Sequence, residues 1–263
     1  MLLLALGLMS LLRKSNAGPK PLPYTGIAMS GGEWYDPTKT HNAVYGKDFS
    51  YPTPDEYKYF KAKGMNIFRI CFLWETIQPK PLKPLDPKQL AILKEHVEDG
   101  TNLGAVVVLD PHNYARYYKK IVGQDVPSAY FADFWRRMAI EFKDNPNVWF
   151  GLVNEPHDMP GEVWVGDAND AIAAIRSTGA KNTITVCGNA WSGAFSWSDN
   201  WYGTPNSTLM QGIKDPGNNY VIEVHSYFDT DNSGTHAQAI SETIGAERLQ
   251  GFTTWCRQNH KMA

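Results

Sequence analysis

Residues 148–157 read VWFGLVNEPH, an apolar run that ends abruptly in an amide and a carboxyl group. Side chains alternate along a β-strand, so Val153 and Glu155 lie on one face, with Glu155 at the carboxyl end. Partial desolvation there raises the pKa of a carboxyl group and suits it to general acid catalysis. Asn154 lies on the opposite face of the strand, so its side chain reaches the same pocket as Glu155 only if the chain turns there, as Pro156 indicates. Alternatively, Glu155 caps the following helix or pairs with a base.

The surrounding chain repeats this arrangement of a short apolar run followed by a longer amphipathic one. Thr53-Pro54 and Asp86-Pro87 are typical helix starts, in which an N-cap residue precedes a proline at the first helical position. Alternating strands and helices are typical of a parallel sheet covered by helices. The expected strands are 26–30, 66–72, 105–110, 148–154, 183–188 and 220–227. The expected helices are 55–63, 87–100, 128–144, 162–179 and 237–259.

Polar residues gather at the late positions of the expected strands. On the third strand, Asp110 and then His112 share one face, after apolar residues. On the sixth strand, Glu223, His225 and Tyr227 share one face. A barrel has this pattern because apolar side chains fill its axis and its active site lies at the carboxyl ends of the strands. No GxGxxG motif follows the first strand, which disfavours a dinucleotide-binding fold. The sequence predicts one α/β domain, a (β/α)8 TIM barrel with about six of eight strand–helix units present.

Charge and composition narrow the class of ligand. The 263 residues include 25 Lys and Arg against 27 Asp and Glu, a formal net charge of −2. This balance argues against nucleic-acid and anionic-membrane partners, because both require a clustered positive field. Aromatic residues make up 13% of the chain, with 9 Trp and 13 Tyr, which exceeds the need of an ordinary core. We therefore expect a ligand with a flat apolar face, and we have no reason to expect more than a monomer.

Several catalytic chemistries lack their sequence motif. Cys71, Cys187 and Cys256 form no CxxC pair, and neither HxH nor HExxH occurs, so we expect no metal site and no cofactor. No Gly-x-Ser-x-Gly elbow or Walker loop is present, which disfavours serine hydrolases and nucleotide hydrolases. Carboxylate chemistry beside aromatic rings remains, and this combination fits glycoside hydrolysis.

The first residues indicate a targeting segment. Residues 2–12 are nearly all apolar, and residues 15–17 form a small-x-small cleavage site. We expect a signal peptide over 1–17, a secreted protein, a proline-containing linker over 18–25, and a catalytic domain over 26–263. The positive charges follow the apolar run instead of preceding it, so an uncleaved anchor or a wrongly assigned start is the alternative.

Arg69 places a charge inside an apolar strand, which is costly unless the charge is paired. Its expected partner is Glu223, Asp110 or a carboxylate outside this sequence. His112 and His225 bring hydrogen-bonding groups to strand ends. A lone histidine more often plays a structural part, but here several such groups converge on the same end of the expected sheet.

Taken together, these motifs carry a family resemblance. They are FRI at 68–70 with LWE at 73–75, DPHNYAR at 110–116, NEPHD at 154–158, and VHSY at 224–227 with the segment 229–236. These motifs follow one another in the order found in glycoside hydrolase family 5, which the chain resembles from about residue 26 to residue 263. The likeness is greatest to the endo-β-1,4-glucanases of that family, the cellulases of fungal and bacterial type.

The resemblance implies a retaining double displacement on a β-glucan, with no cofactor. Glu155 would be the general acid/base, Asn154 would steady the sugar 2-hydroxyl, and Arg69 would orient the nucleophile. Trp191 looks like a sugar-stacking position of the family, and ordinary packing is the alternative for the other rings. The cleavage subsite would be lined by His112, His225 and Tyr227, and the further stacking candidates are Trp34, Trp74, Tyr114 and Trp197.

One departure from the family concerns the nucleophile. In the family this glutamate ends the seventh strand, and we expect it beyond Ala263, with about 60 residues missing at roughly 30 per strand–helix unit. Retaining chemistry requires two carboxyl groups about 5 to 5.5 Å apart, and neither Glu223 nor Glu75 is expected at that place. We therefore expect negligible turnover from a polypeptide ending at Ala263, and aggregation through two unpaired strand edges.

Three readings stay open. The first is an N-terminal portion of a secreted retaining endoglucanase. The second is a pseudo-enzyme that binds β-glucan without cutting it. The third is an enzyme of the same family that acts on β-mannan, xyloglucan or β-1,3-glucan. The resemblance over 112–116 and 229–236 favours a cellulose-type β-1,4-glucan.

Overall fold

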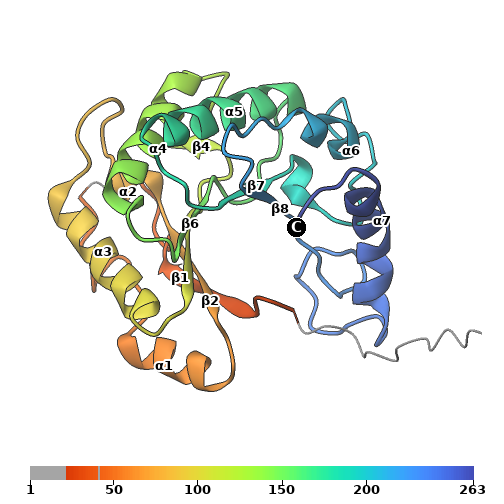
Figure 1. The fold of residues 1–263 in the computed structure, drawn as a ribbon, viewed down its shortest axis with the longest axis horizontal. Coiled ribbons are helices and arrows are strands. Elements are labelled where there is room, and N and C mark those ends of the chain that lie inside the picture. The colour runs from red at the N-terminus through yellow and green to blue at the C-terminus, as the bar shows by residue number, and fades with distance from the viewer. Residues whose placement is uncertain (1–21, 41) are drawn as a thin grey trace, which may run out of the picture.

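Six parallel strands form one curved sheet in the computed structural model, which describes residues 22–40 and 42–263. The spatial order is β1-β2-β3-β6-β7-β8, so each strand of this sheet lies beside the next one along the chain. Figure 1 shows the strands curving around a centre with helices on the outside. The strands are β1 (Gly26–Gly32), β2 (Ile67–Phe72), β3 (Val106–Pro111), β6 (Val148–Gly151), β7 (Ile184–Cys187) and β8 (Tyr220–Glu223).

Helices connect these strands, and together they confirm the predicted α/β barrel architecture over six strand–helix units. A short hairpin that the sequence pattern did not predict lies between β3 and α4, formed by β4 (Arg116–Tyr117) and β5 (Lys120–Ile121). The α-helices are α1 (Pro54–Ala62), α2 (Trp74–Ile77), α3 (Pro87–Thr101), α4 (Ser128–Phe142), α5 (Gly161–Ser177), α6 (Asn206–Leu209) and α7 (Ile244–Gln258). Two 3₁₀ turns are η1 (Ala190–Ser192) and η2 (Met210–Gly212).

Local chemistry explains two of the helix starts. Thr53 and Glu56 form a capping box at α1, in which the Thr53 hydroxyl accepts from the Glu56 N–H and the Glu56 carboxylate accepts from the Thr53 N–H. Asp86 caps α3 by accepting from the N–H groups of Lys88 and Gln89. α3 begins at the predicted residue 87, and α1 begins at Pro54, one residue before the predicted start.

Three predicted boundaries were wrong by three residues or more, and the others differ by at most two. The strand predicted over 148–154 ends at Gly151, and the strand predicted over 220–227 ends at Glu223. The last helix begins at Ile244 instead of residue 237, because the preceding residues fold into a loop closed by side chains. In that loop Asp229 is buried and accepts hydrogen bonds from the Ser233 hydroxyl and the His236 N–H. Side-chain bonds of this kind favour turns over helix.

Aromatic side chains dominate the layer between the sheet and the helices. Phe131, Phe134 and Trp135 of α4 are buried, and so is Trp164 of α5. The indole of Trp135 donates to the Leu152 carbonyl, which ties α4 to the end of β6. Burial of these large side chains fixes the helices against the sheet and thereby holds the strand ends in place.

The described ends of the chain lie near the sheet. Ile222 of β8 donates its N–H to the Met262 carbonyl at 2.9 Å, and Figure 1 places the C-terminal end beside β8. The expected signal peptide over 1–17 and residues 18–21 of the expected linker lie outside the described residues. Within 22–40 and 42–263, no helix has the length and apolar character needed to cross a membrane.

Candidate active site

Parallel strands bring their carboxyl ends to one end of the sheet, and polar residues from four strands meet there. Arg69 on β2 is at the centre of this group. Its Nη1 lies 3.0 Å from Asp110 Oδ2, its Nη2 lies 3.1 Å from Glu223 Oε1, and Nη2 also donates to Asn154 Oδ1 at 2.7 Å. Both carboxylates that the sequence offered as partners of Arg69 are therefore paired with it.

This ion-pair group changes the acidity of its members. Burial alone would lower the pKa of Arg69, but Asp110 and Glu223 raise it, so the guanidinium stays charged. Burial alone would raise the pKa of Glu223, but the charge of Arg69 and a hydrogen bond from His225 lower it to about 2. Asp110, 1% exposed, also contacts His112, with Oδ2 2.8 Å from His112 Nδ1. The group is a preorganised set of charges at the barrel end.

The turn predicted after β6 is present. Glu155 has a φ of 41°, in the left-handed region that few residues other than glycine adopt, and this turn brings Asn154 and Glu155 to the same end of the sheet. Asn154 is 2% exposed and reaches Arg69, whereas the Glu155 side chain points toward His225 and its Oε1 is hydrogen-bonded to His225 Nδ1. Asn154 thus joins the Arg69 group at the strand ends, and only Glu155 of the two lines the cavity described next.

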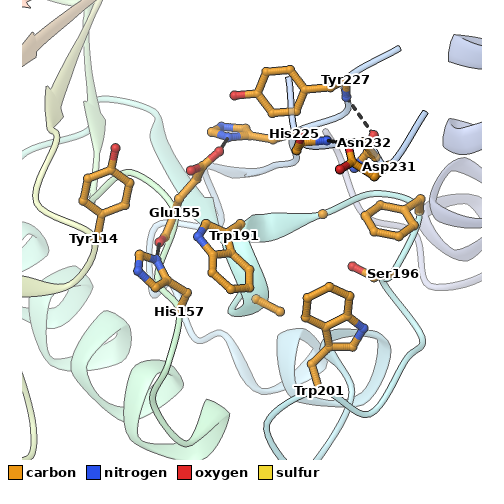
Figure 2. A pocket seen from close by; sticks show the side chains of 14 residues that line it. Tyr114, Glu155, His157, Trp191, Ser196, Trp201, His225, Tyr227, Asp231 and Asn232 are labelled. Carbon is orange, nitrogen blue, oxygen red and sulfur yellow. Dashed lines mark hydrogen bonds and ion pairs between the residues drawn. The ribbon is translucent and has the colours of Figure 1, made fainter. Parts of the chain in front are cut away.

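A cavity of about 610 Å³ opens at Glu155. Figure 2 shows Glu155 between Tyr114 on one side and Trp191 on the other, with His225 and Tyr227 above it. A carboxyl group and several flat rings facing one cavity are suited to a sugar polymer, because rings pack on the apolar faces of pyranoses. The aromatic and histidine residues that line the cavity are Tyr114, His157, Trp191, Phe195, Trp201, His225 and Tyr227.

A second hollow of about 410 Å³ continues past Tyr114, which lines both spaces. It holds three of the predicted residues, Trp34, His112 and Tyr114. The Trp34 ring is 70% exposed and so is available to a ligand. We call these two hollows, which share Tyr114 as a lining residue, the groove. Two neighbouring hollows match an extended ligand better than a compact one.

Among the predicted stacking residues, Trp191 lines the cavity at Glu155 and is held there by contacts with two other rings. Its ring stacks on His157 with centroids 4.7 Å apart and planes 10° from parallel. Trp191 itself has a φ of 54°, and η1 holds it at the cavity wall. The Trp201 ring stands at 78° to the Trp191 ring, with centroids 5.9 Å apart. The rings of Trp191 and Trp201 thus form two nearly perpendicular apolar walls of the cavity that Glu155 also lines.

Two predicted stacking residues were wrong. Trp74 is 1% exposed, packs among Phe131 and Phe134 of α4, and donates its indole N–H to Gln78. Trp197 is 2% exposed and makes edge contacts with two rings of α7, Phe252 and Trp255. Both rings face the helix layer and are sealed from the groove, so neither can stack on a ligand.

Three ring-bearing residues that line the cavity at Glu155 were not predicted from the sequence: His157, Phe195 and Trp201. His157 follows Glu155 by two positions, and its Nδ1 lies 2.8 Å from the Glu155 carbonyl oxygen. Phe195 and Trp201 lie in a loop dense in aromatic residues after β7, and this density was the available signal.

Three groups of side chains within the described part of the chain bring possible metal ligands within 4.8 Å of one another. In two of them the carboxylate, Asp110 or Glu223, already pairs with Arg69, and a guanidinium competes with a metal cation for those oxygens. The third group is Asp229, Asp231 and His236, where Asp229 is used to close its own loop. Nothing in these contacts requires a metal.

Relatives of known name share the sequence and the fold. The chain is 37% identical over 241 residues to Endo-beta-1,4-glucanase B of Emericella nidulans, covering 91% of this chain and 70% of that protein. It is 36% identical to Endo-beta-1,4-glucanase B of Aspergillus niger, covering 83% of this chain and 64% of that protein. The solved structure of XacCel5A in complex with cellopentaose superposes with a TM-score of 0.87 at 44% identity, over 90% of this chain and 76% of that one.

The chain therefore spans about two thirds of the length of these curated relatives. Over residues 28–263 it matches the family model described as Cellulase (glycosyl hydrolase family 5). On its sequence, its fold and the residues around Glu155, the protein is a member of the cellulase family, glycosyl hydrolase family 5.

Proposed function

We propose that this protein is a secreted, monomeric, retaining endo-β-1,4-glucanase in which Glu155 is the general acid/base. The observation that carries the proposal is the position of Glu155 in a groove between the rings of Tyr114 and Trp191. Its relatives named endo-β-1,4-glucanases and the cellopentaose complex of XacCel5A support the choice of a β-1,4-glucan. The signal peptide over 1–17 and the catalytic domain over 26–263 are part of the proposal.

In this mechanism Glu155 donates its proton to the leaving glycosidic oxygen while a carboxylate attacks the anomeric carbon. In the second step Glu155 takes a proton from water, which then displaces that carboxylate. Arg69 holds the amide oxygen of Asn154, and we assign the amide N–H of Asn154 to the sugar 2-hydroxyl. His225 and Tyr227 line the cavity at Glu155, His112 lines the hollow on the other side of Tyr114, and the three would border the cleaved bond.

The attacking carboxylate must lie about 5 to 5.5 Å from Glu155 with space for a sugar between them. Glu223 does not meet this condition, because the His225 ring lies between the two carboxylates and Arg69 holds Glu223. Glu75 is buried, accepts hydrogen bonds from Asn113 and Tyr118, and lines the second hollow but not the cavity of Glu155. We propose that the nucleophile is a glutamate beyond Ala263.

The proposal is tested by hydrolysis with the full-length gene product. Cellopentaose and carboxymethylcellulose are compared with β-mannan, xyloglucan and β-1,3-glucan, and the anomer released first is identified by NMR. We expect β-1,4-glucan to be preferred, with retention of configuration. Glu155→Gln should lower kcat by about 10² to 10⁴, since general acid–base catalysis contributes that much, and should leave cellopentaose binding intact. Glu98→Gln, an exposed position on α3, is the matched control.

Other outcomes separate the alternatives. Preference for mannan, xyloglucan or β-1,3-glucan would move the substrate assignment within the family. Binding of cellopentaose that is unaffected by Glu155→Gln, with no hydrolysis by any variant, would favour a non-catalytic β-glucan-binding protein.

A further inference from the structure

Glu155 belongs to a chain of four side chains that runs from the groove into the sheet. Glu155 Oε1 is hydrogen-bonded to His225 Nδ1, and His225 Nε2 lies 3.2 Å from Glu223 Oε1. The other Glu223 oxygen, Oε2, accepts from the Thr185 hydroxyl at 2.8 Å. Thr185 lies on β7, beside β8, so the chain ends on the rigid part of the fold.

We propose that Glu223 is a positioning residue that holds the His225 ring so that its Nδ1–H points at Glu155 and leaves the other Glu155 oxygen to carry the transferred proton. This inference rests on the proposed role of Glu155 as general acid/base and extends it to residues deeper in the sheet.

His225 lies between two carboxyl groups, and these determine its protonation. Each ring nitrogen faces a carboxyl oxygen, one of Glu155 and one of Glu223. When both carboxyl groups are ionised they can only accept hydrogen bonds, so in that state both ring nitrogens donate. A ring that donates from both nitrogens is an imidazolium. Burial by itself lowers the pKa of His225, but its hydrogen bonds to Glu155 and Glu223 raise it to about 9.

The two oxygens of Glu155 have different surroundings. Oε1 receives the Nδ1–H of His225, so it is not free to donate a proton to that nitrogen. Oε2 accepts no hydrogen bond from any residue in the described part of the chain, and the carboxyl group lines the cavity. The proton that passes to the leaving oxygen is thereby assigned to Oε2.

Without Glu223, the His225 ring is free to lose its charge. A neutral imidazole has one accepting nitrogen, and if that nitrogen is Nδ1 it takes the proton of Glu155 in competition with the sugar oxygen. Glu223 prevents this by pairing with Nε2–H and keeping the ring charged. Glu223 is held in turn by two residues, because Thr185 donates to its Oε2 and Arg69 pairs with its Oε1. The backbone of His225 is held separately, by Ser192 and Ala194.

Pairing with Arg69 does not by itself account for Glu223. Arg69 already has Asp110 at 3.0 Å, which balances its charge, whereas His225 is balanced by Glu155 and Glu223. The charged groups in direct contact with this histidine are Glu155, after β6, and Glu223, on β8. The Cys187 sulfur on β7 lies within 4.8 Å of the same group, and Tyr227 lines the same cavity. Arg69 and Asp110 follow behind Glu223, because Arg69 pairs with both carboxylates.

The test is a histidine titration followed by ¹⁵N NMR on the full-length gene product, with the His225 signals assigned from His225→Gln. In the wild-type protein we expect two N–H signals from His225 that persist above pH 8. Glu223→Gln keeps the shape of the side chain and removes its charge, so the pKa of His225 should fall by about 1 to 3 toward its ordinary value. Thr185→Val should give a smaller decrease, and Glu98→Gln none.

An unchanged His225 titration in folded Glu223→Gln would overturn the proposal. If that variant does not fold, Thr185→Val decides in the same way, because it keeps the Arg69–Glu223 pair. In parallel, kcat for cellopentaose is measured against pH, where Glu223→Gln should shift the alkaline limb to lower pH with an unchanged KM. A shifted titration in a protein without hydrolysis would contradict the proposed function alone, since the NMR readout does not depend on turnover.

Discussion

Arg69→Met is the substitution that most directly tests the charged group under the groove. It keeps an apolar stem and removes the cation that pairs with both Asp110 and Glu223. Two buried carboxylates are then left beside each other, and Asn154 loses its donor at 2.7 Å. Breaking a buried ion pair in this way costs about 3 to 5 kcal/mol, because the remaining charge is uncompensated.

The pKa of Glu223 gives a second measure of how much this ion pair stabilises the protein. Burial opposes its ionisation, yet Arg69 and His225 together bring its pKa from 4.5 to about 2, which corresponds to about 3 kcal/mol. Because this pKa is lower in the folded than in the unfolded state, the stability is present above pH 4.5 and is lost as the pH falls toward 2. Arg69→Met should therefore lower the free energy of unfolding by about 3 kcal/mol at pH 7, and the two proteins should converge in acid.

The assay is urea unfolding followed by tryptophan fluorescence at several pH values. Arg136→Met is the matched control, since Arg136 is 42% exposed and its pair with Asp133 on the surface should contribute less than about 1 kcal/mol. If Arg69→Met were as stable as Arg136→Met at pH 7, or if its deficit persisted unchanged below pH 3, the reasoning would be refuted.

Further expectations concern the rings, the loop and the chain itself. Trp191→Ala should weaken cellopentaose binding about tenfold with little loss of stability, because its ring lines the cavity. Trp197→Ala should lower the free energy of unfolding by about 3 to 5 kcal/mol, because its ring is in the core. Calorimetric titration measures the binding and urea unfolding the stability, and the reverse pattern would contradict the assignment. Glu75→Gln should weaken the hydrogen bonds that Asn113 and the Tyr118 N–H donate to this side chain, and should lower the free energy of unfolding by about 1 to 3 kcal/mol. An unchanged free energy of unfolding would show that these hydrogen bonds do not stabilise the protein. A polypeptide of these 263 residues alone should show negligible turnover and aggregate through its strand edges, and a cooperative melt with cellulose hydrolysis at this length would disprove this expectation.

Sequence patterns predicted best where the signal is local. Alternation along the strands and the caps at Thr53 and Asp86 depend on neighbouring residues, and they located the strands and helix starts. The last helix was placed too early because Asp229 closes a loop through residues several positions away. The rings of Trp74 and Trp197 were misassigned because residue type does not reveal which layer a side chain faces.

What the sequence by itself determined is the barrel class, the family and the place of Glu155, Asn154 and Arg69 at strand ends. Strand alternation and the order of the strands encode these features without any distance information. Only the tertiary structure decided that Glu223 shares His225 with Glu155, and which rings border the groove. Glu155 and His225 are 70 residues apart along the chain, and their contact exists because the closing curve of the sheet brings β6 and β8 to one end.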